Sequence, residues 1–376
     1  MALKDVLKSS DRPRKLLALD GGGIRGAMTI EVLARIEEIL RARTGREDLV
    51  LGDWFDYVGG TSTGGIIATC IAAGMSTAEI RTFYVKQGPA MFDKAFLLKR
   101  LWYTYEAEPL ARELRRVLGE GRTLGSEDLH CLLMLVMRNA TTDSPWPLSS
   151  NPAAKYNDRA RQDCNLALPL WQLVRASAAA PVFFPPEYVK LGSKEFMFVD
   201  GGVTSYNNPA FLLFLMATHP AYRLGWSTGA ERMLLVSIGT GSDPATSDAR
   251  HGEVPNLLAN AQGVPSALMS AASAQQDQLC RTFGRTVAGE MIDREVGSLR
   301  EEEPSPSGYP RLPALFTYAR YNVELTEGGL ADIGIAGVDP RKIASLDAVE
   351  GIPDLQRVGR ALADRRVEPR HFDGFA

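Results

Sequence analysis

The sequence predicts an α/β protein: a three-layer α/β/α sandwich around a mostly parallel sheet, with a helical extension at its C-terminal end. Two observations lead to this prediction. Short apolar runs stop at glycines, most clearly at residues 15–20, 54–60, 196–200 and 233–238, as buried parallel strands do. The segments between such runs carry apolar residues at helical spacing, so we expect helices on both faces of the sheet.

The first expected strand, residues 15–20, leads into three glycines and then into a helix whose apolar positions recur through residues 30–40. The second, residues 54–60, leads through Ser62 into a helix of small residues. A strand, a glycine turn and an amphipathic helix make half of a βαβ unit, which implies parallel pairing. The remaining strands are expected at residues 132–137, 196–200 and 233–238.

Composition changes along the chain suggest its organisation. The segment after Ser242 turns polar and then rich in alanine, glutamine and proline, so the boundary of the catalytic domain is expected near residue 245. A long stretch between the second and third strands is expected to form helices and to serve as a lid. The expected parts are a lead-in (1–15), a catalytic domain (16–245) with a motif-bearing core (16–212) and a lid (74–129), and a mostly helical extension packing on the core (246–376).

Charge and cysteine usage exclude several classes of function. The chain has 42 basic and 45 acidic residues and a net charge of −3, mixed along its length, so nucleic acid is not an expected partner. The four cysteines lack CxxC spacing, so neither a zinc site nor a disulfide framework is expected.

Residues 1–15 have no apolar run typical of a secretion signal, and no stretch is apolar for about 18 residues. We therefore expect a cytoplasmic protein whose membrane contact is peripheral.

The strongest local motif is a GxSxG sequence between an expected strand and an expected helix, comprising Gly60, Thr61, Ser62, Thr63 and Gly64. At such a junction the chain turns sharply, and glycines on both sides of the serine avoid clashes while its hydroxyl is presented at the sheet edge. The helix that follows favours negative charge at its N-terminus. The alternative is a glycine-rich turn in which the serine caps the helix, which is the commoner meaning of an isolated GxSxG.

A second glycine motif follows the first strand and comprises Gly21, Gly22, Gly23, Arg25 and Gly26. As GxGxxG it predicts a dinucleotide-binding turn, but that fingerprint needs an acidic residue at the end of the second strand, about 20 residues on. The glutamates at that distance lie in or just after the expected helix instead. Consecutive glycines can also direct backbone N–H groups at one point to stabilise an oxyanion, with Arg25 adding positive charge.

The base for Ser62 is expected to be a carboxylate rather than a histidine. None of the four histidines follows an expected core strand; His219 is the best placed of them. Asp200 ends a strand and is followed by Gly201 and Gly202, so it is expected at the same sheet edge as Ser62. A carboxylate there gains basicity from partial burial. The alternative is an ordinary turn aspartate at a strand end.

Taken together, three glycine-flanked polar groups at strand ends provide a nucleophile, a base and oxyanion donors. The motifs at residues 20–26, 60–64 and 200–202, in this order, resemble the patatin-like phospholipase family, with further similarity at residues 176–186 and 237–241. The resemblance implies a patatin-like fold. It also implies a Ser–Asp dyad of Ser62 and Asp200 and an oxyanion loop of Gly22, Gly23, Arg25 and Gly26.

The same resemblance implies a lipid acyl hydrolase of the phospholipase A or lysophospholipase type, acting through an acyl-enzyme at the inner face of a membrane. No metal or cofactor is implied. Some bacterial enzymes of this family are antiphage effectors switched on by cyclic nucleotides, so a cyclic nucleotide activator is a further expectation. The alternatives are a nucleotide-binding oxidoreductase that uses the Gly21–Gly26 turn, and a non-lipid esterase with the same dyad.

Overall fold

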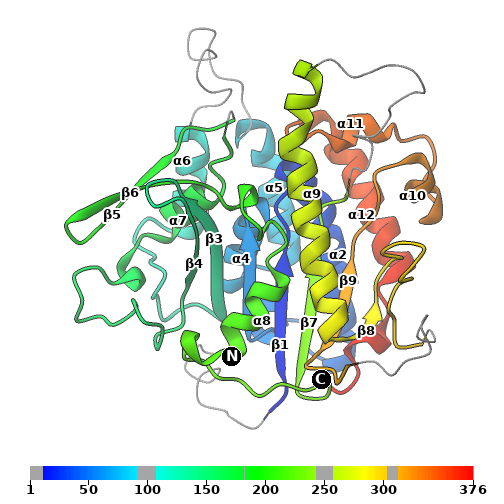
Figure 1. Ribbon diagram of the computed structural model, residues 1–376, viewed down its shortest axis with the longest axis horizontal. Helices are drawn as coiled ribbons and strands as arrows, with labels where there is room; N and C mark the ends of the chain where they lie inside the picture. The colour runs from blue at the N-terminus through cyan, green and yellow to red at the C-terminus, as the bar shows by residue number, and fades with distance from the viewer. Residues whose placement is uncertain (1–11, 92–106, 182, 243–256, 303–311, 376) are drawn as a thin grey trace.

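The protein is described by a computed structural model for residues 12–91, 107–181, 183–242, 257–302 and 312–375. The strands of these residues form a single nine-stranded sheet (Figure 1), ordered β5-β6-β3-β2-β1-β7-β9-β8, with β4 also paired to β3. The strands are β1 (Arg14–Leu19), β2 (Tyr57–Thr61), β3 (Leu132–Asn139), β4 (Ser144–Ser149), β5 (Glu187–Leu191), β6 (Lys194–Asp200), β7 (Met233–Ile238), β8 (Arg285–Ala288) and β9 (Thr317–Tyr321).

Helices lie on both faces of the sheet (Figure 1). They are α2 (Gly26–Thr44), α3 (Leu51–Trp54), α4 (Thr63–Ala72), α5 (Thr77–Met91), α6 (Ala107–Leu118), α7 (Leu170–Ser177), α8 (Ala210–Thr218), α9 (Leu257–Phe283), α10 (Glu327–Asp332), α11 (Pro340–Ala344) and α12 (Ile352–Arg366). Among the described residues, no helix is both long enough and apolar enough to cross a bilayer.

The alternation of side chains along β1 produces two hydrophobic cores. Leu17 and Leu19 belong to the core beneath α2, α4 and α12, whereas Leu16 and Ala18 belong to the core beneath α8. All four are fully buried, which is why this strand is an uninterrupted apolar run in the sequence. The predicted three-layer α/β/α architecture is confirmed.

The C-terminal part of the chain is attached to the core through α12, which packs against α2. Gly359 allows this close approach, because a Cβ at that position would lie 2.6 Å from the Met28 carbonyl oxygen. Residues beyond 245 also supply β8 and β9, and β9 pairs in parallel with β7. The domain boundary near residue 245 stays a prediction, but the sheet itself continues past it.

The strand that carries Asp200 runs in the opposite direction to the one expected. β6 pairs with β3 in antiparallel fashion, over residues 137–139 of β3, whereas β2 pairs with β3 in parallel over residues 132–136. Because β4 occupies the other edge of β3 over residues 134–139, β2 and β6 must share one edge. The two strands therefore meet end to end, and their C-terminal residues become neighbours.

The expected lid, residues 74–129, contains α5 and α6. Residues 92–106 between these helices lie outside the described part of the chain, so the lid stays a prediction.

Candidate active site

Ser62 occupies a sharp turn between β2 and α4. Its backbone has φ 55° and ψ −123°, a left-handed conformation that costs a non-glycine residue about 1–3 kcal/mol. The serine side chain is half-buried and stands at the N-terminus of α4, where the helix favours a developing negative charge. This is the geometry expected for an exposed nucleophile at a strand-to-helix turn.

The two glycines of the GxSxG motif are required by close backbone contacts. A Cβ at Gly60 would clash with the Gly64 carbonyl oxygen, and a Cβ at Gly64 would clash with the carbonyl oxygen of Leu19 at the end of β1. Gly64 therefore lets α4 begin directly against β1. The motif is explained by packing around Ser62, as the sequence predicted.

Ser62 and Asp200 are in direct contact. The Ser62 hydroxyl donates a hydrogen bond of 2.6 Å to Asp200 Oδ2, and the Gly202 N–H donates one of 2.6 Å to Asp200 Oδ1. Gly201 lies between Asp200 and Gly202 in the sequence, and a Cβ at Gly201 would clash with the Val136 carbonyl oxygen. Each carboxylate oxygen thus accepts a hydrogen bond. The bond from the Ser62 hydroxyl carries the proton that a base would have to remove.

The electrostatic environment suits Asp200 to the role of a base near neutral pH. Burial raises the pKa of Asp200 to about 6, although the hydrogen bonds from Ser62 and Gly202 and the positive charge of Arg175 act to lower it. A base is most effective when its pKa lies close to the working pH. An ordinary exposed aspartate would be a much weaker base.

The histidines of the described residues make contacts elsewhere. His130 Nδ1 lies 2.9 Å from Asp53 Oδ1, and His371 Nδ1 lies 2.8 Å from the Tyr321 hydroxyl. His219, the best-placed histidine in the sequence, accepts a hydrogen bond from the Ala221 N–H. His251 lies outside the described residues. The structure thus brings Asp200, and none of the described histidines, to the Ser62 hydroxyl.

Ser177 supports the backbone of Ser62 and was not predicted as a functional residue. Its hydroxyl accepts a hydrogen bond of 3.0 Å from the Ser62 N–H and donates one of 2.6 Å to the Val136 carbonyl oxygen. Ser177 is fully buried at the end of α7. Because the Ser62 N–H is occupied in this way, it is not available to an oxyanion. The only sequence signal was the similarity at residues 176–186, which names no role for this serine.

The backbone N–H groups of the glycine loop divide into two sets. Ile24 N–H donates to the Leu346 carbonyl oxygen at 2.9 Å, and Arg25 N–H donates to that of Gly22 at 3.2 Å. Gly26 N–H donates to the carbonyl oxygens of residues 23 and 24. Among the hydrogen bonds of the described residues, none uses the N–H of Gly22 or of Gly23 as donor. If the loop stabilises an oxyanion as predicted, these are the two amides that could donate to it.

The glycine loop is packed against protein rather than open to a large ligand. A Cβ at Gly22 would clash with the Thr240 side chain, and one at Gly23, whose φ is +58°, would clash with the Leu346 carbonyl oxygen. Thr240 Oγ1 also donates a hydrogen bond of 2.7 Å to the Gly21 carbonyl oxygen. In a dinucleotide-binding turn, the group that lies close to the glycine backbone is the pyrophosphate of the ligand. These contacts argue against the nucleotide-binding alternative.

The two threonines of the GxSxG motif hold the neighbouring loops. Thr61 Oγ1 donates a hydrogen bond of 2.6 Å to the Tyr206 carbonyl oxygen. Thr63 Oγ1 bonds to the Tyr84 hydroxyl, which donates at 2.7 Å to the Gly23 carbonyl oxygen. The turn at Ser62 and the glycine loop are therefore connected through buried hydroxyl groups.

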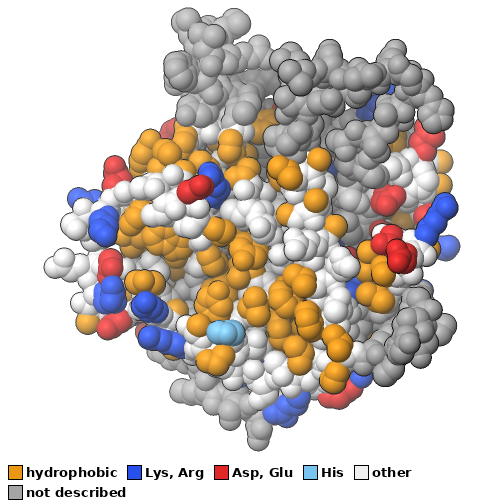
Figure 2. Space-filling view, in the orientation of Figure 1, with side chains coloured by type: hydrophobic (Ala, Val, Ile, Leu, Met, Phe, Trp, Pro, Cys, Tyr) orange, Lys and Arg blue, Asp and Glu red, His pale blue; other side chains and the backbone are white. Residues whose placement is uncertain are grey.

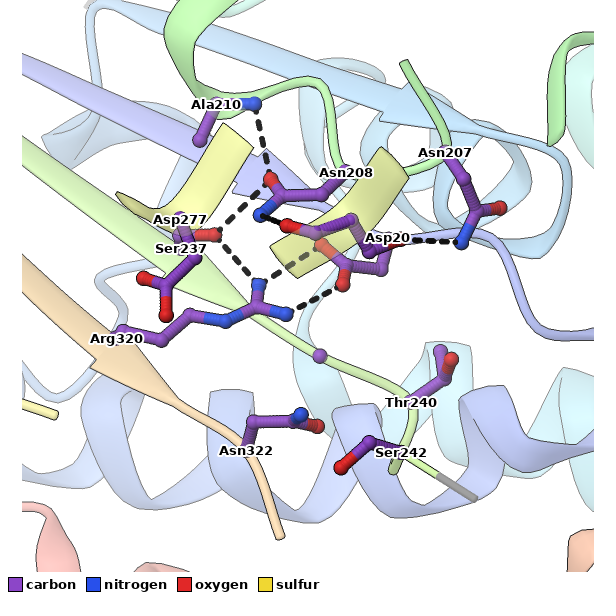
Figure 3. Close-up of polar contacts among 12 residues, drawn as sticks. Asp20, Asn207, Asn208, Ala210, Ser237, Thr240, Ser242, Asp277, Arg320 and Asn322 are labelled. Atoms are coloured by element: carbon purple, nitrogen blue, oxygen red, sulfur yellow. Dashed lines mark hydrogen bonds and ion pairs between the residues drawn. The ribbon is translucent and has the colours of Figure 1, made fainter. Parts of the chain in front are cut away.

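A buried ion pair anchors the start of the glycine loop. Arg320 on β9 donates two parallel hydrogen bonds, of 2.9 and 2.6 Å, to the two carboxylate oxygens of Asp20 (Figure 3). Arg320 also donates to Ser237 Oγ at 2.7 Å. Asp20 directly precedes Gly21, so a side chain 300 residues away fixes the loop. Sequence reasoning did not single out Arg320, because nothing near it along the chain indicates a buried charge.

The chain is similar in sequence to known proteins. The sequence model of a family described as patatin-like phospholipase matches residues 17–214. The chain is similar to a cGAMP-activated phospholipase of Vibrio cholerae, with 34% identity over 53% of this chain and 56% of that protein. It is similar to a cGAMP-activated phospholipase of Escherichia coli, with 31% identity over 61% of this chain and 63% of that protein.

A plant protein is similar to the same degree. Patatin-17 of Solanum cardiophyllum is 31% identical over 60% of each chain. The chain thus spans less than two thirds of the length of each of these three relatives.

Proposed function

The chain belongs to the patatin-like phospholipase family, and we propose that it is a lipid acyl hydrolase that cleaves fatty acyl esters of phospholipids or lysophospholipids. Ser62 is the proposed nucleophile and Asp200 the proposed base. The observation that carries the proposal is the 2.6 Å hydrogen bond from the Ser62 hydroxyl to a buried carboxylate.

In the proposed first step, Asp200 takes the hydroxyl proton while Ser62 Oγ forms a bond to the ester carbonyl carbon. The carbonyl oxygen becomes an oxyanion, and the N–H groups of Gly22 and Gly23, with the positive charge of Arg25, stabilise it. The ester C–O bond then breaks. Asp200 returns its proton to the departing alcohol, which leaves the acyl group on Ser62.

In the proposed second step, water replaces the alcohol. Asp200 takes one proton from the water as its oxygen bonds to the acyl carbon, and the same oxyanion donors act again. The bond to Ser62 Oγ breaks, the proton passes from Asp200 to Ser62, and a fatty acid is released. Every proton transfer in this scheme uses groups that are already hydrogen-bonded or that enter with the substrate.

The test of the dyad compares three variants for fatty acid release from phospholipid vesicles and from a nitrophenyl ester. Ser62→Ala and Asp200→Asn should each lower the rate by several orders of magnitude, while both proteins stay folded. His219→Ala is the matched control and should keep its activity. Full activity in Asp200→Asn would overturn the role of Asp200. Hydrolysis of the nitrophenyl ester with no hydrolysis of phospholipid would favour the non-lipid esterase.

We also propose a peripheral membrane contact beside the dyad. Val203, which follows Gly202, is 40% exposed, and Leu268 on α9 is 65% exposed. The neighbour of Leu268, Met269, reaches within 3.2 Å of the position that a Gly202 Cβ would take. On the face shown in Figure 2, apolar side chains spread over its middle while charged side chains lie mainly around the rim. Such a surface fits the boundary of a lipid bilayer.

This contact predicts a difference between substrates. Leu268→Glu should lower the rate on vesicles and leave hydrolysis of a soluble nitrophenyl ester unchanged, because only the vesicle requires docking. Leu312→Glu alters a similarly exposed leucine, 58% exposed, and serves as the control. Equal rates on vesicles for Leu268→Glu and Leu312→Glu would contradict the proposed contact.

A cyclic nucleotide activator is a further proposal, supported by the names of the two bacterial relatives, which are called cGAMP-activated phospholipases. Addition of cGAMP should raise the rate of fatty acid release by the native protein and leave Ser62→Ala inactive. An unchanged rate over a wide range of cGAMP concentrations would contradict activation by this nucleotide, and it would leave the hydrolase assignment untouched.

A further inference from the structure

A polar hollow of about 450 Å³ lies beside the dyad, at the carboxyl ends of β1, β7 and β9. Its walls come from the loops after these strands, from α9 and from residues 290–292. Figure 3 shows part of the wall, with Asp20 after β1, Thr240 and Ser242 after β7, Arg320 on β9 and Asn322 after β9. The carboxyl edge of a parallel sheet is where α/β proteins bind their ligands.

The hollow extends to the proposed active site through Asn207 and Met269, which both line it. A Cβ placed on Gly21 would lie 3.3 Å from Ser62 Cβ and would clash with Asn207 Oδ1. A Cβ placed on Gly202 would lie 3.0 Å from the same Asn207 oxygen and 3.2 Å from Met269 Cε. When the ester group of a substrate lies at Ser62, another part of the same molecule can therefore reach this hollow.

Three arginines and four acidic side chains line the hollow, and most of them neutralise one another. Arg320 is bound by both carboxylate oxygens of Asp20. Arg281 donates to both carboxylate oxygens of Asp277, at 3.1 and 2.8 Å. The other charged groups of the wall are Arg25, which belongs to the glycine loop, and two glutamates.

The two glutamates, Glu290 and Glu324, have carboxylates without a hydrogen-bond or ion-pair partner among the described residues. Burial raises the pKa of Glu290 to about 7; the nearby Arg366 lowers it, and the negative charge of Glu324 raises it. A buried carboxylate is stabilised in its charged form by an adjacent cation. The wall thus presents two carboxylates that can accept hydrogen bonds from a cation, Glu290 half-buried and Glu324 exposed.

The other residues of the wall indicate which kind of cation the two glutamates could bind. Among the described residues that line the hollow there is no aromatic side chain, whereas Ser242, Ser270, Ser273 and Thr240 supply hydroxyl groups. A quaternary ammonium such as choline is usually held by aromatic rings. A primary ammonium instead donates hydrogen bonds, which carboxylates and hydroxyls accept.

We propose that this hollow binds the head group of the lipid substrate and selects a primary ammonium, as in phosphatidylethanolamine, through Glu290 and Glu324. The inference rests on the proposed phospholipase function and adds the head-group class. An anionic glycerol head group has no cation for the glutamates, and a choline head group has no hydrogens to donate.

The test measures the ratio of hydrolysis rates for phosphatidylethanolamine and phosphatidylglycerol with identical acyl chains, in mixed micelles, with cGAMP added if the protein requires it. The native protein should prefer phosphatidylethanolamine. Glu290→Gln and Glu324→Gln should each lower this ratio on the order of tenfold, through KM, because a charge-assisted hydrogen bond is lost. Glu295→Gln, an exposed glutamate on the same loop, is the control and should keep the native ratio.

A second measurement uses a soluble probe. Glycerophosphoethanolamine should inhibit hydrolysis of a nitrophenyl ester competitively, more strongly than glycerophosphocholine or glycerophosphoglycerol, and Glu290→Gln should remove the difference. Equal inhibition by the three probes, or an unchanged lipid ratio in both glutamine variants, would overturn the head-group assignment. Failure of the native protein to hydrolyse any phospholipid would instead overturn the proposed function, and the two failures are therefore distinguishable.

Discussion

Ser62 and Asp200 stand next to one another because the strands that carry them occupy consecutive positions on one edge of β3. Thr61, the last residue of β2, pairs with Val136, and Asp200, the last residue of β6, pairs with Met137. The two strands approach from opposite directions, so the residues at their ends are brought together although they are 138 positions apart in the sequence. The 2.6 Å contact between their side chains is a consequence of this arrangement.

The activity should depend on pH through Asp200. Only the ionised carboxylate can accept the Ser62 proton, and burial raises the pKa of this group to about 6. We expect kcat/KM for a nitrophenyl ester to increase with pH and to reach a plateau, with a midpoint near pH 6. Rates measured across the range in which the fold is stable would check this, and a profile that is flat through pH 6 would exclude Asp200 as the base.

The same pKa predicts that Asp200 reduces the stability of the fold. A carboxyl group whose pKa is higher in the folded state than in the unfolded state stabilises the fold at low pH, and this contribution is lost as the pH rises through about 6. Asp200→Asn removes the buried charge and retains hydrogen-bonding atoms toward Ser62 and Gly202. Above pH 6 the variant should be inactive but more stable, by at most about 3 kcal/mol.

Chemical denaturation of Asp200→Asn and the native protein at several pH values measures this difference. The two unfolding curves should converge as the pH falls below about 4, where Asp200 is protonated in both states. A variant that is less stable than the native protein at pH 8 would contradict the predicted cost of the buried charge.

Ser177→Ala should impair catalysis more than substrate binding. The substitution leaves the Ser62 N–H and the Val136 carbonyl oxygen without their hydrogen-bond partner, which costs about 1–3 kcal/mol of stability. Because Ser62 holds a strained backbone conformation, loss of this support should lower kcat by about tenfold or more with little change in KM.

The control for Ser177→Ala is Thr69→Val, which removes another buried hydroxyl, on α4, that bonds to the Gly65 carbonyl oxygen. It should lose some stability and keep its kcat. If both variants lose stability alike and neither loses activity, Ser177 is a packing residue without an effect on the nucleophile.

The Asp20–Arg320 pair should show strong coupling. Arg320→Gln leaves the Asp20 carboxylate buried and without its cation, which should cost about 3–5 kcal/mol of stability. The double variant Asp20→Asn with Arg320→Gln removes both charges and should recover much of this loss. Urea denaturation of the two single variants and the double variant measures the coupling. Additive losses would mean that the pair is not a stabilised unit.

The part of the fold that was predictable from sequence is the part in which a strand is a continuous apolar run that ends at a turn. Five such strands were predicted, and all five are present, because a continuous apolar run ended by a turn is a local signal. β4, β5, β8 and β9 were not predicted. β4 contains two prolines, and β9 contains Arg320, whose burial depends on Asp20 at the other end of the chain.

The site was predictable where a motif reports local backbone geometry. The glycines around Ser62 are required by nearby backbone atoms, whereas Gly22 is required by the Thr240 side chain and Gly23 by the Leu346 carbonyl oxygen. The position of Asp200 was predicted correctly, but the reason was wrong, because β6 runs antiparallel to β3. Ser177 and Asn207 act through contacts that only the folded chain creates, and no local pattern distinguishes them from other small polar residues. The catalytic roles themselves stay predictions.

The family model matches residues 17–214, yet the carbonyl oxygen that receives the Ile24 N–H belongs to Leu346. Thr240, which holds the Gly21 carbonyl oxygen, also lies beyond that region. A fragment limited to residues 17–214 would contain Ser62, Asp200 and every glycine of the three motifs but would lack these contacts to the glycine loop. We therefore expect a fragment that ends at residue 214 to be inactive, and an active fragment to extend at least as far as Leu346.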